Sequence, residues 1–335
     1  MTSRRRFQFR LRTLLLVSAF ASIPLGWIAW QLEEARRIPS VLEWIDEVGG
    51  DYETAGESRN GGIGAWFGIE AAPRVVSVRI DGFHTIQGKG KLDLSPLACL
   101  EDLEELSLYS VHVEDFSDLA GLEKLKSLSL GYVQVDDLSS LVAVKNLRDL
   151  FMNDVGPGDY SVLGALGVVN LTLMKAPGGD LSFLEGCSGL QELSIWDTPV
   201  DDLRPLSQLQ SLHEVTLNRT QVTDISPLAS LNNLRALRVR ESPLKDLSSL
   251  STITSLEILC VDETNVSDLS PLSSLNKLRH LSIKETPVND ISPVMELDGF
   301  WIGSIQLEGS NVSEEQITRF LELMSERWRT SREHQ

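Results

Sequence analysis

The chain has 335 residues, of which 42% are hydrophobic, and its formal net charge is −18. Residues 1–12 contain five arginines and no acid, so residues 13–335 carry −23, and so acidic a body disfavours nucleic acid as a partner because it repels phosphates. Cys99, Cys187 and Cys260 are an odd number spread widely along the chain, which excludes a disulfide framework.

The amino terminus has the pattern of a membrane anchor. An uncharged run over residues 13–32 follows the arginine-rich residues 1–12. A helix of that length rises about 30 Å, which matches the hydrocarbon core of a bilayer. Because basic flanks favour the cytoplasmic side, the sequence predicts a cytoplasmic tail at 1–12, a single transmembrane helix at 13–32 and an extracytoplasmic body.

Two features of this segment leave alternatives open. Ala19-Phe20-Ala21 fits the processing site of a cleaved signal peptide, although cleavage there would expose the apolar run Ile23–Trp30. Ser3–Phe7 also resembles the start of a twin-arginine export signal. The R-x-R-T-L-L-L wording of residues 10–16, with P-L-G-W at 24–27, resembles the anchor of many bacterial exported proteins of unassigned role.

Residues 33–93 are predicted to form an amino-terminal cap, a loop and an irregular first strand. A helix capped by Ser40 is expected to cover the open edge of the core, and Asp51–Gly64 is expected to be a polar loop. The apolar face of this helix is Val41, Trp44, Ile45 and Val48. Val75–Ile80 has strand spacing, and Gly82–Lys91 is an insertion predicted to form a surface loop.

An aspartate recurs at nearly regular intervals through the rest of the chain. Its positions are Asp93, Asp115, Asp137, Asp159, Asp180, Asp202, Asp224, Asp246, Asp268 and Asp290. Eight of the nine intervals are 22 residues and one is 21, which predicts a single supersecondary unit repeated in a solenoid. About ten such units occupy residues 94–312, and the short one is Tyr160–Asp180.

The apolar spacing changes in the middle of each unit, as Ile225–Asp246 illustrates. Apolar residues recur every third position from 225 to 234, and Leu237 and Val239 then alternate as in a strand. The L-x-x-L-x-L pattern of Leu234, Leu237 and Val239, with the D-I-S-P-L wording at 224–228, resembles the leucine-rich repeat family, most closely its 22-residue internalin-like class. The resemblance covers about residues 75–312. It implies an α/β repeat solenoid with a parallel sheet on its concave side and short helical or extended convex segments.

The recurring aspartates have a structural interpretation and a chemical one. In the structural one, each carboxylate accepts the backbone N–H two residues further on, and the serine and proline that follow, as at Ser226 and Pro227, repeat the capping. In the chemical one, neighbouring carboxylates share Ca²⁺ ions along the column. Each unit offers only one regular acid, so the sequence favours the structural role and predicts no metal.

Side chains that flank the strand-core residues point out of the sheet and line its concave face. Two groups of them differ from the small polar majority, one aromatic or apolar and one basic. They are Tyr109, Phe151, Met174 and Trp196, and Arg238, Arg240 and Lys284. Because exposed aromatics on a sheet favour recognition, these seven are the predicted binding residues. The alternative is an ordinary surface on which the cations balance Glu241 and Glu285.

Residues 313–335 are predicted to form a carboxy-terminal capping helix and a polar tail that frays from Arg329. Ser313 and Gln316 have the spacing of a capping box. The expected apolar face is Ile317, Phe320, Leu321, Met324 and Trp328.

The sequence offers no catalytic constellation. Its five histidines are scattered, none is paired at i and i+4, and no metalloprotease, hydrolase or redox motif occurs. It therefore predicts no catalytic residue and no cofactor. The predicted function is that of a membrane-anchored, extracytoplasmic leucine-rich repeat module that binds a protein or a cell-envelope component; the alternative is a structural envelope protein without a dedicated ligand.

Overall fold

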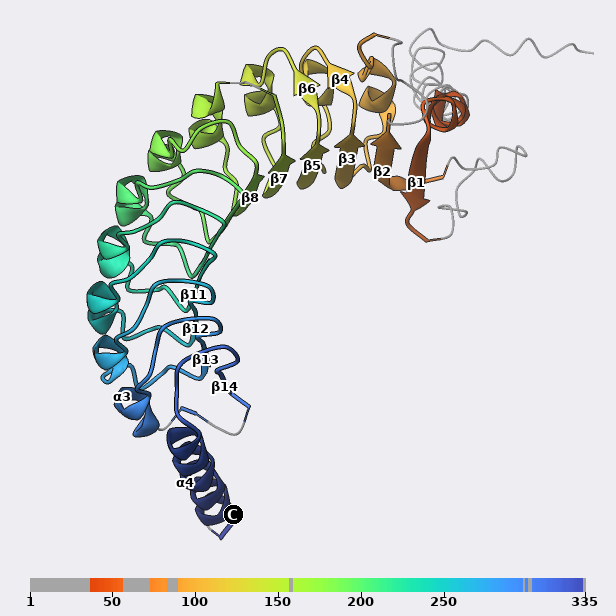
Figure 1. Cartoon of the computed structure of the whole chain (residues 1–335). Helices are drawn as coiled ribbons and strands as arrows, with labels where there is room; N and C mark the ends of the chain where they lie inside the picture. Colours follow the sequence, from red (N-terminus) through yellow and green to blue (C-terminus); the bar gives the residue numbers. More distant parts are fainter. Residues whose placement is uncertain are drawn as a thin grey trace, which may run out of the picture.

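The computed structural model describes residues 37–56, 73–82, 90–156, 159–297, 299–300 and 303–333. These residues form a curved solenoid with strands along its inner side and short helices along its outer side (Figure 1). The predicted tail at 1–12 and the predicted anchor at 13–32 lie outside the described residues. Within those ranges, no helix has both the length and the apolar character needed to cross a bilayer.

One twelve-stranded sheet extends through all the repeats. Its order is β1-β2-β3-β5-β7-β8-β9-β10-β11-β12-β13-β14, with β1 antiparallel to β2 and every later neighbour parallel. The strands of this sheet are β1 (Gly50–Thr54), β2 (Val75–Asp81), β3 (Glu105–Tyr109), β5 (Ser127–Gly131), β7 (Asp149–Asn153), β8 (Asn170–Met174), β9 (Glu192–Trp196), β10 (Glu214–Asn218), β11 (Ala236–Arg240), β12 (Ile258–Cys260), β13 (His280–Ser282) and β14 (Ile305–Gln306). A second, two-stranded sheet pairs β4 (His112–Val113) with β6 (Gln134–Val135).

The convex side is built from short 3₁₀ helices. They are η1 (Ser95–Cys99), η2 (Ser117–Leu119), η3 (Ser139–Ala143), η4 (Tyr160–Ala165), η5 (Ser182–Gly186), η6 (Arg204–Gln208), η7 (Ser226–Ser230), η8 (Ser248–Thr252) and η9 (Ser270–Leu272), followed by the α-helices α3 (Ser292–Met295) and α4 (Glu314–Glu333). Three residues per turn explain the apolar spacing, because Leu228, Leu231 and Leu234 each donate a backbone N–H to the carbonyl three residues earlier. All three side chains are fully buried.

The recurring aspartates hold the start of each convex segment. At all ten positions the carboxylate accepts the backbone N–H two residues further on, at 2.8–2.9 Å. The predicted second capping by Ser226 is wrong, since its hydroxyl donates to Asp224 at 2.9 Å and the N-cap position of η7 is Ile225, whose side chain makes no capping hydrogen bond. Asp224 therefore accepts both the backbone N–H and the hydroxyl of Ser226.

These hydrogen bonds stabilise the ionised carboxylates. At six of the aspartates the carboxyl pKa lies below its ordinary value, because the residue two positions further on donates hydrogen bonds to the carboxylate. The main donor is the backbone N–H at Asp93 and Asp290. At the other four aspartates the main donor is the side chain. The six aspartates concerned are Asp93, Asp115, Asp159, Asp202, Asp268 and Asp290.

The amino-terminal cap differs from its prediction in two respects. The described helix already includes residue 37, and Ser40 lies inside it, donating its hydroxyl to the Arg37 carbonyl, so Ser40 is not the cap. The polar loop predicted from Asp51 begins instead as the edge strand β1, paired with β2. Of the predicted apolar face, Val41 and Ile45 are buried and Trp44 and Val48 are half-buried against the core, and Ile38, which was not predicted, is buried with them.

The carboxy-terminal helix α4 docks on the last repeat through Gln316. Ser313 accepts the Gln316 backbone N–H at 3.3 Å, while the Gln316 amide donates to Asp290 instead of turning back to Ser313. Phe320 and Met324 are buried as predicted, but Leu321 is 46% exposed. The helix continues to Glu333, beyond the predicted fraying point at Arg329.

Each repeat turns sharply after its strand through a residue with left-handed backbone. Nine of these residues are not glycine and have φ between 48° and 54°: Ser110, Tyr132, Asp154, Lys175, Asp197, Arg219, Glu241, Glu263 and Glu285. In the last repeat Gly309 takes this position, with φ 73°. Each of these nine residues donates its N–H to a carbonyl of the next repeat. The repeated bond holds a conformation that is unusual for residues other than glycine.

Candidate functional site

The concave face consists of rows of side chains set by the parallel register. A central row includes Ser129, Phe151, Thr172, Ser194, Thr216 and Arg238. An end row, two residues further along each strand, includes Tyr109, Gly131, Asn153, Met174, Trp196, Asn218 and Arg240. The seven predicted binding residues therefore divide between different rows and different parts of the arc.

Three of the predicted residues form a patch in the middle of the arc. Met174 and Trp196 are direct cross-strand neighbours in the end row. Phe151 lies in the central row opposite Thr172, which makes it a diagonal neighbour of Met174. Trp196 is 37% exposed, and the other two are half-buried. We call Phe151, Met174 and Trp196 the concave patch.

Tyr109 does not belong to this patch. It occupies the end row on β3, and Gly131 and Asn153 separate it from Met174. Its ring lies over Gly131, where an added Cβ would come within 2.3 Å of the Tyr109 Cδ1 atom. Gly131 therefore gives the tyrosine ring a place against the sheet, and this accounts for Tyr109 without a ligand.

Two asparagines flank the concave patch in the same row. Asn153 precedes Met174, and Asn218 follows Trp196. The side-chain oxygen of each is buried and accepts no hydrogen bond from any residue that the structure describes. Leaving a buried polar atom unpaired costs about 1–3 kcal/mol. The sequence interpretation missed both residues, although the 22-residue period places them in this row.

The predicted basic spot carries little free charge, because each cation has an acidic partner. Arg238 pairs with Glu214 on β10. Arg240 Nε lies 3.2 Å from Asp262 Oδ2, and Lys284 Nζ lies 3.4 Å from Glu308 Oε2. The partners expected from sequence were wrong as well, since Glu241 pairs with Arg219 at 2.7 Å.

Asp262 is the centre of a polar cluster at this end of the sheet. It is 8% exposed and accepts from the Ser282 hydroxyl and, at 3.0 Å, from the Lys284 backbone N–H. Burial, followed by the charge of Arg238, lowers the pKa of the nearby His280. Burial likewise raises the pKa of the Cys260 thiol, which disfavours the reactive thiolate.

Among the described residues, the recurring aspartates serve the backbone and the concave face carries an apolar patch. Within those ranges, no three His, Cys, Asp or Glu side chains are placed to hold one metal ion. The recurring aspartates are engaged with backbone N–H groups, which is the structural role predicted for them. What the concave face offers is an apolar patch bordered by amides.

The comparisons support the fold. No family model matches the chain, and no curated protein matches its sequence. The structure is similar to an internalin, InlF, from Listeria monocytogenes, with 24% identity, 76% of this chain and 82% of that chain covered, and a TM-score of 0.56. It is also similar to the functional domain of InlJ from Listeria monocytogenes, with 17% identity, 75% and 59% covered, and a TM-score of 0.51.

The predicted leucine-rich repeat solenoid with a parallel concave sheet is thereby confirmed. The InlJ domain includes a cysteine ladder. In this chain the three cysteines are unpaired and occupy different positions of the repeat. Because 441 solved chains match, the fold is too widely shared to identify a partner, and function has to be argued from the residues of the concave face.

Proposed function

We propose that this chain is a non-catalytic recognition module that binds a protein partner through the concave patch. The observation that carries the proposal is the direct pairing of Met174 with the exposed Trp196 on an otherwise small and polar sheet, with Phe151 diagonally adjacent. Tryptophan is enriched among the residues that dominate binding energy at interfaces. Asn153 and Asn218 border the patch in the same row, with their side-chain oxygens buried in the unbound chain.

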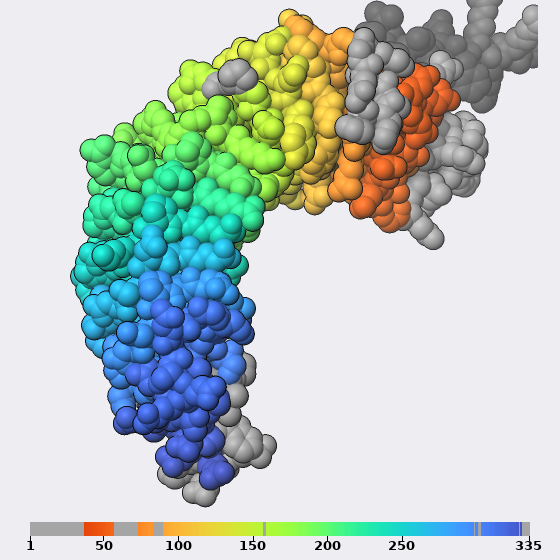
Figure 2. Space-filling view, in the orientation of Figure 1, coloured from red at the N-terminus to blue at the C-terminus, as the bar shows by residue number. Residues whose placement is uncertain are grey.

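The shape of the molecule supports the same role. The described body is a continuous arc that is hollow on its inner side (Figure 2). Strands β7, β8 and β9, which carry the patch, lie near the middle of this arc (Figure 1). A partner seated in the hollow could therefore contact the patch and the strands on either side at once. Paired charges such as Arg238 and Glu214 would then contribute to the orientation and specificity of binding more than to its affinity.

Anchoring to a membrane is part of this proposal. The arginines of residues 1–12 and the uncharged run 13–32 support a single transmembrane helix with its amino terminus in the cytoplasm and the repeats outside. An accessible body on a short tether would suit recognition of a protein or an envelope component. Protease added to cells whose inner membrane is intact should degrade the repeats, and their protection until that membrane is breached would contradict export.

The recognition itself is tested by capture with matched variants of the full chain. Phe151→Ser with Trp196→Ser should reduce saturable partner capture at least tenfold, since about 1.4 kcal/mol corresponds to a factor of ten. The control is Val142→Ser, because Val142 is 52% exposed and lies on the convex helix η3. Equal capture by the wild type and the double variant would exclude the patch, and absence of any saturable partner would favour the structural alternative.

A further inference from the structure

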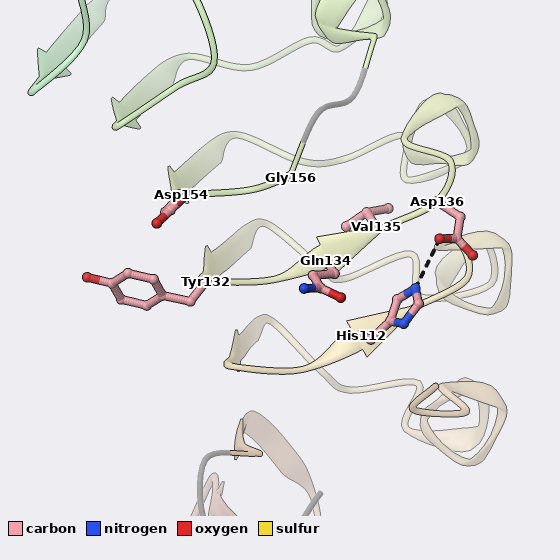
Figure 3. Close-up of a pocket in the computed structure, with 7 residues that line it drawn as sticks. All are labelled: His112, Tyr132, Gln134, Val135, Asp136, Asp154 and Gly156. Atoms are coloured by element: carbon pink, nitrogen blue, oxygen red, sulfur yellow. Dashed lines mark hydrogen bonds and ion pairs between the residues drawn. The ribbon is translucent and has the colours of Figure 1, made fainter. Parts of the chain in front are cut away.

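A groove on the flank of the solenoid lies apart from the concave patch. It has a volume of about 630 Å³, within the range of small-ligand sites, and its walls come from three successive repeats. We call it the flank groove; His112, Tyr132, Gln134, Asp136, Asp154 and Gly156 bound it. Figure 3 shows the His112–Asp136 pair on one side, Tyr132 and Asp154 on the other, and Gln134 between them.

The floor of this groove is the second sheet, β4 and β6. His112 pairs with Gln134 and Val113 with Val135 in parallel register. The third repeat continues the floor, because the Gly156 N–H donates to the Val133 carbonyl at 3.1 Å. Gly156 also leaves space, since an added Cβ would meet nothing closer than Gln134 Cα at 4.0 Å.

The polar groups on the two sides of the groove differ in their partners. Asp136 binds Lys91 Nζ at 2.7 Å and His112 Nε2 at 3.0 Å, so this side is held in place. Neither the Gln134 amide in the middle nor the Asp154 carboxylate on the other side makes a side-chain hydrogen bond or ion pair to any described residue. The Tyr132 hydroxyl is equally free, and the ring contacts only a cation, Lys175 Nζ, 5.7 Å from its centroid.

Tyr132 differs from the other residues at the left-handed turn position of the repeat. Its backbone is left-handed with φ 54°, and the other eight non-glycine residues at this position are serine, lysine, arginine or acids. The Tyr132 N–H donates to the Asn153 carbonyl at 2.7 Å, as in the other repeats, so the turn itself is a feature of the fold. The tyrosine side chain remains 49% exposed and gains no place in the core, which leaves its ring accessible to a ligand.

We propose that the flank groove binds an uncharged saccharide. Carboxylate, amide and imidazole groups together accept from and donate to neighbouring hydroxyl groups, and the electron-rich face of Tyr132 suits the C–H face of a sugar ring. The three carboxylates of Asp136, Asp154 and the adjacent Glu114 outnumber the two nearby ammonium groups of Lys91 and Lys175, which disfavours anionic ligands. A peptide is disfavoured because, among the described residues of the lining, Val135 is the only aliphatic side chain and could not supply a buried anchor.

The test uses the full chain in a zwitterionic detergent without a sugar headgroup. Cellotriose, maltotriose and triacetylchitotriose serve as probes, and saturation-transfer NMR with titration gives Kd. At least one probe should bind saturably. Tyr132→Ala should weaken that binding about tenfold by removing the stacking face, and Gly156→Trp should abolish it by filling the groove without a backbone clash.

Trp196→Ser is the matched control, since it alters the concave patch and should leave the sugar Kd unchanged. Thermal melts establish that each variant is folded. The saccharide assignment is overturned if no probe binds, if Kd stays within about twofold in both groove variants, or if a lysine-rich peptide saturates the groove instead. Because Trp196→Ser separates the two sites, loss of one activity leaves the other measurable.

Discussion

The first repeats and the last repeats of this solenoid differ at one buried position just after the strand. In the first repeats it holds Val111, Val133 and Val155, and in the later ones it holds threonine or serine, as at Thr264 and Thr286. After the valines the chain stays extended and forms the second sheet of β4 and β6. In the last repeats, the hydroxyls of Thr264 and Thr286 donate to the carbonyl three residues earlier at 2.7 and 2.6 Å.

This difference shows that the residue at one position of the repeat affects whether a second sheet forms on the flank of the solenoid. Valine has no hydrogen-bonding group, so the backbone groups beside it must pair with the neighbouring repeat. Threonine satisfies a carbonyl locally. The residue after it still bonds to the neighbouring repeat, as the Asn265 N–H does to the Leu244 carbonyl at 2.8 Å, but the segment is not a β-strand. The flank groove therefore belongs to the valine-containing repeats, whereas the concave patch lies on β7, β8 and β9, where the two kinds of repeat meet.

The largest expected effect is where the short repeat, Tyr160–Asp180, packs against the repeat that follows it. A Cβ on Gly186 would lie 2.5 Å from the Gly164 carbonyl oxygen, because η4 and η5 stack closely there. Gly186→Ala should lower the free energy of unfolding by about 3 kcal/mol, measured by urea denaturation. Gly189→Ala is the control, since no atom lies within 4 Å of its added Cβ. Equal stability of the two variants would show that this close approach is not required.

The next effect tests the valine position directly. Val133 is fully buried, and Val133→Thr should cost about 2 kcal/mol because its hydroxyl is either unpaired or bonds back and disrupts β6. Val142→Thr on the exposed convex side should change stability by less than about 0.5 kcal/mol. A Val133→Thr variant as stable as the wild type, with the groove intact, would break the proposed link between valine and the second sheet.

The threonine position gives a smaller effect whose size should depend on one hydrogen bond. Thr264→Val removes the bond to the Val261 carbonyl and should cost about 1 kcal/mol. The hydroxyl of Thr220 is buried and has no partner among the described residues, so Thr220→Val should be neutral or stabilising. Calorimetric melts of both variants check this contrast, and equal losses would refute it.

The smallest effect is shared by both regions and concerns pH. Hydrogen bonds lower the pKa of Asp115, Asp159 and Asp268 below the ordinary 3.8, so they contribute stability above that value, which is lost as pH falls through and below it. The triple Asp→Asn variant at these positions should show a flatter decline of Tm below about pH 4, because the amide oxygen still accepts the N–H but does not titrate. Identical slopes would contradict this role.

Sequence periodicity predicted the repeats because each apolar position is repeated in every unit, as at Leu237 and Val239. The sequence did not predict strand β1, because residues 51–54 are exposed and mostly polar and form a strand only by pairing with β2. The ion pairs of Arg238 and Arg240 were also not predictable, since their partners lie 24 and 22 residues away and depend on register and rotamer. The row that joins Met174 to Trp196 follows from the period, whereas the exposure of Trp196 required the structure.

Recognition through the concave patch is tested most directly by photo-crosslinking from position 196 in cells that express the full chain. Trp196→p-benzoylphenylalanine keeps an aromatic side chain in the end row beside Met174. The same substitution at Val142 places the probe on the convex side. A discrete crosslinked protein from position 196 that is absent from position 142 is the expected result. No product from position 196, or the same product from both positions, would contradict binding at the patch.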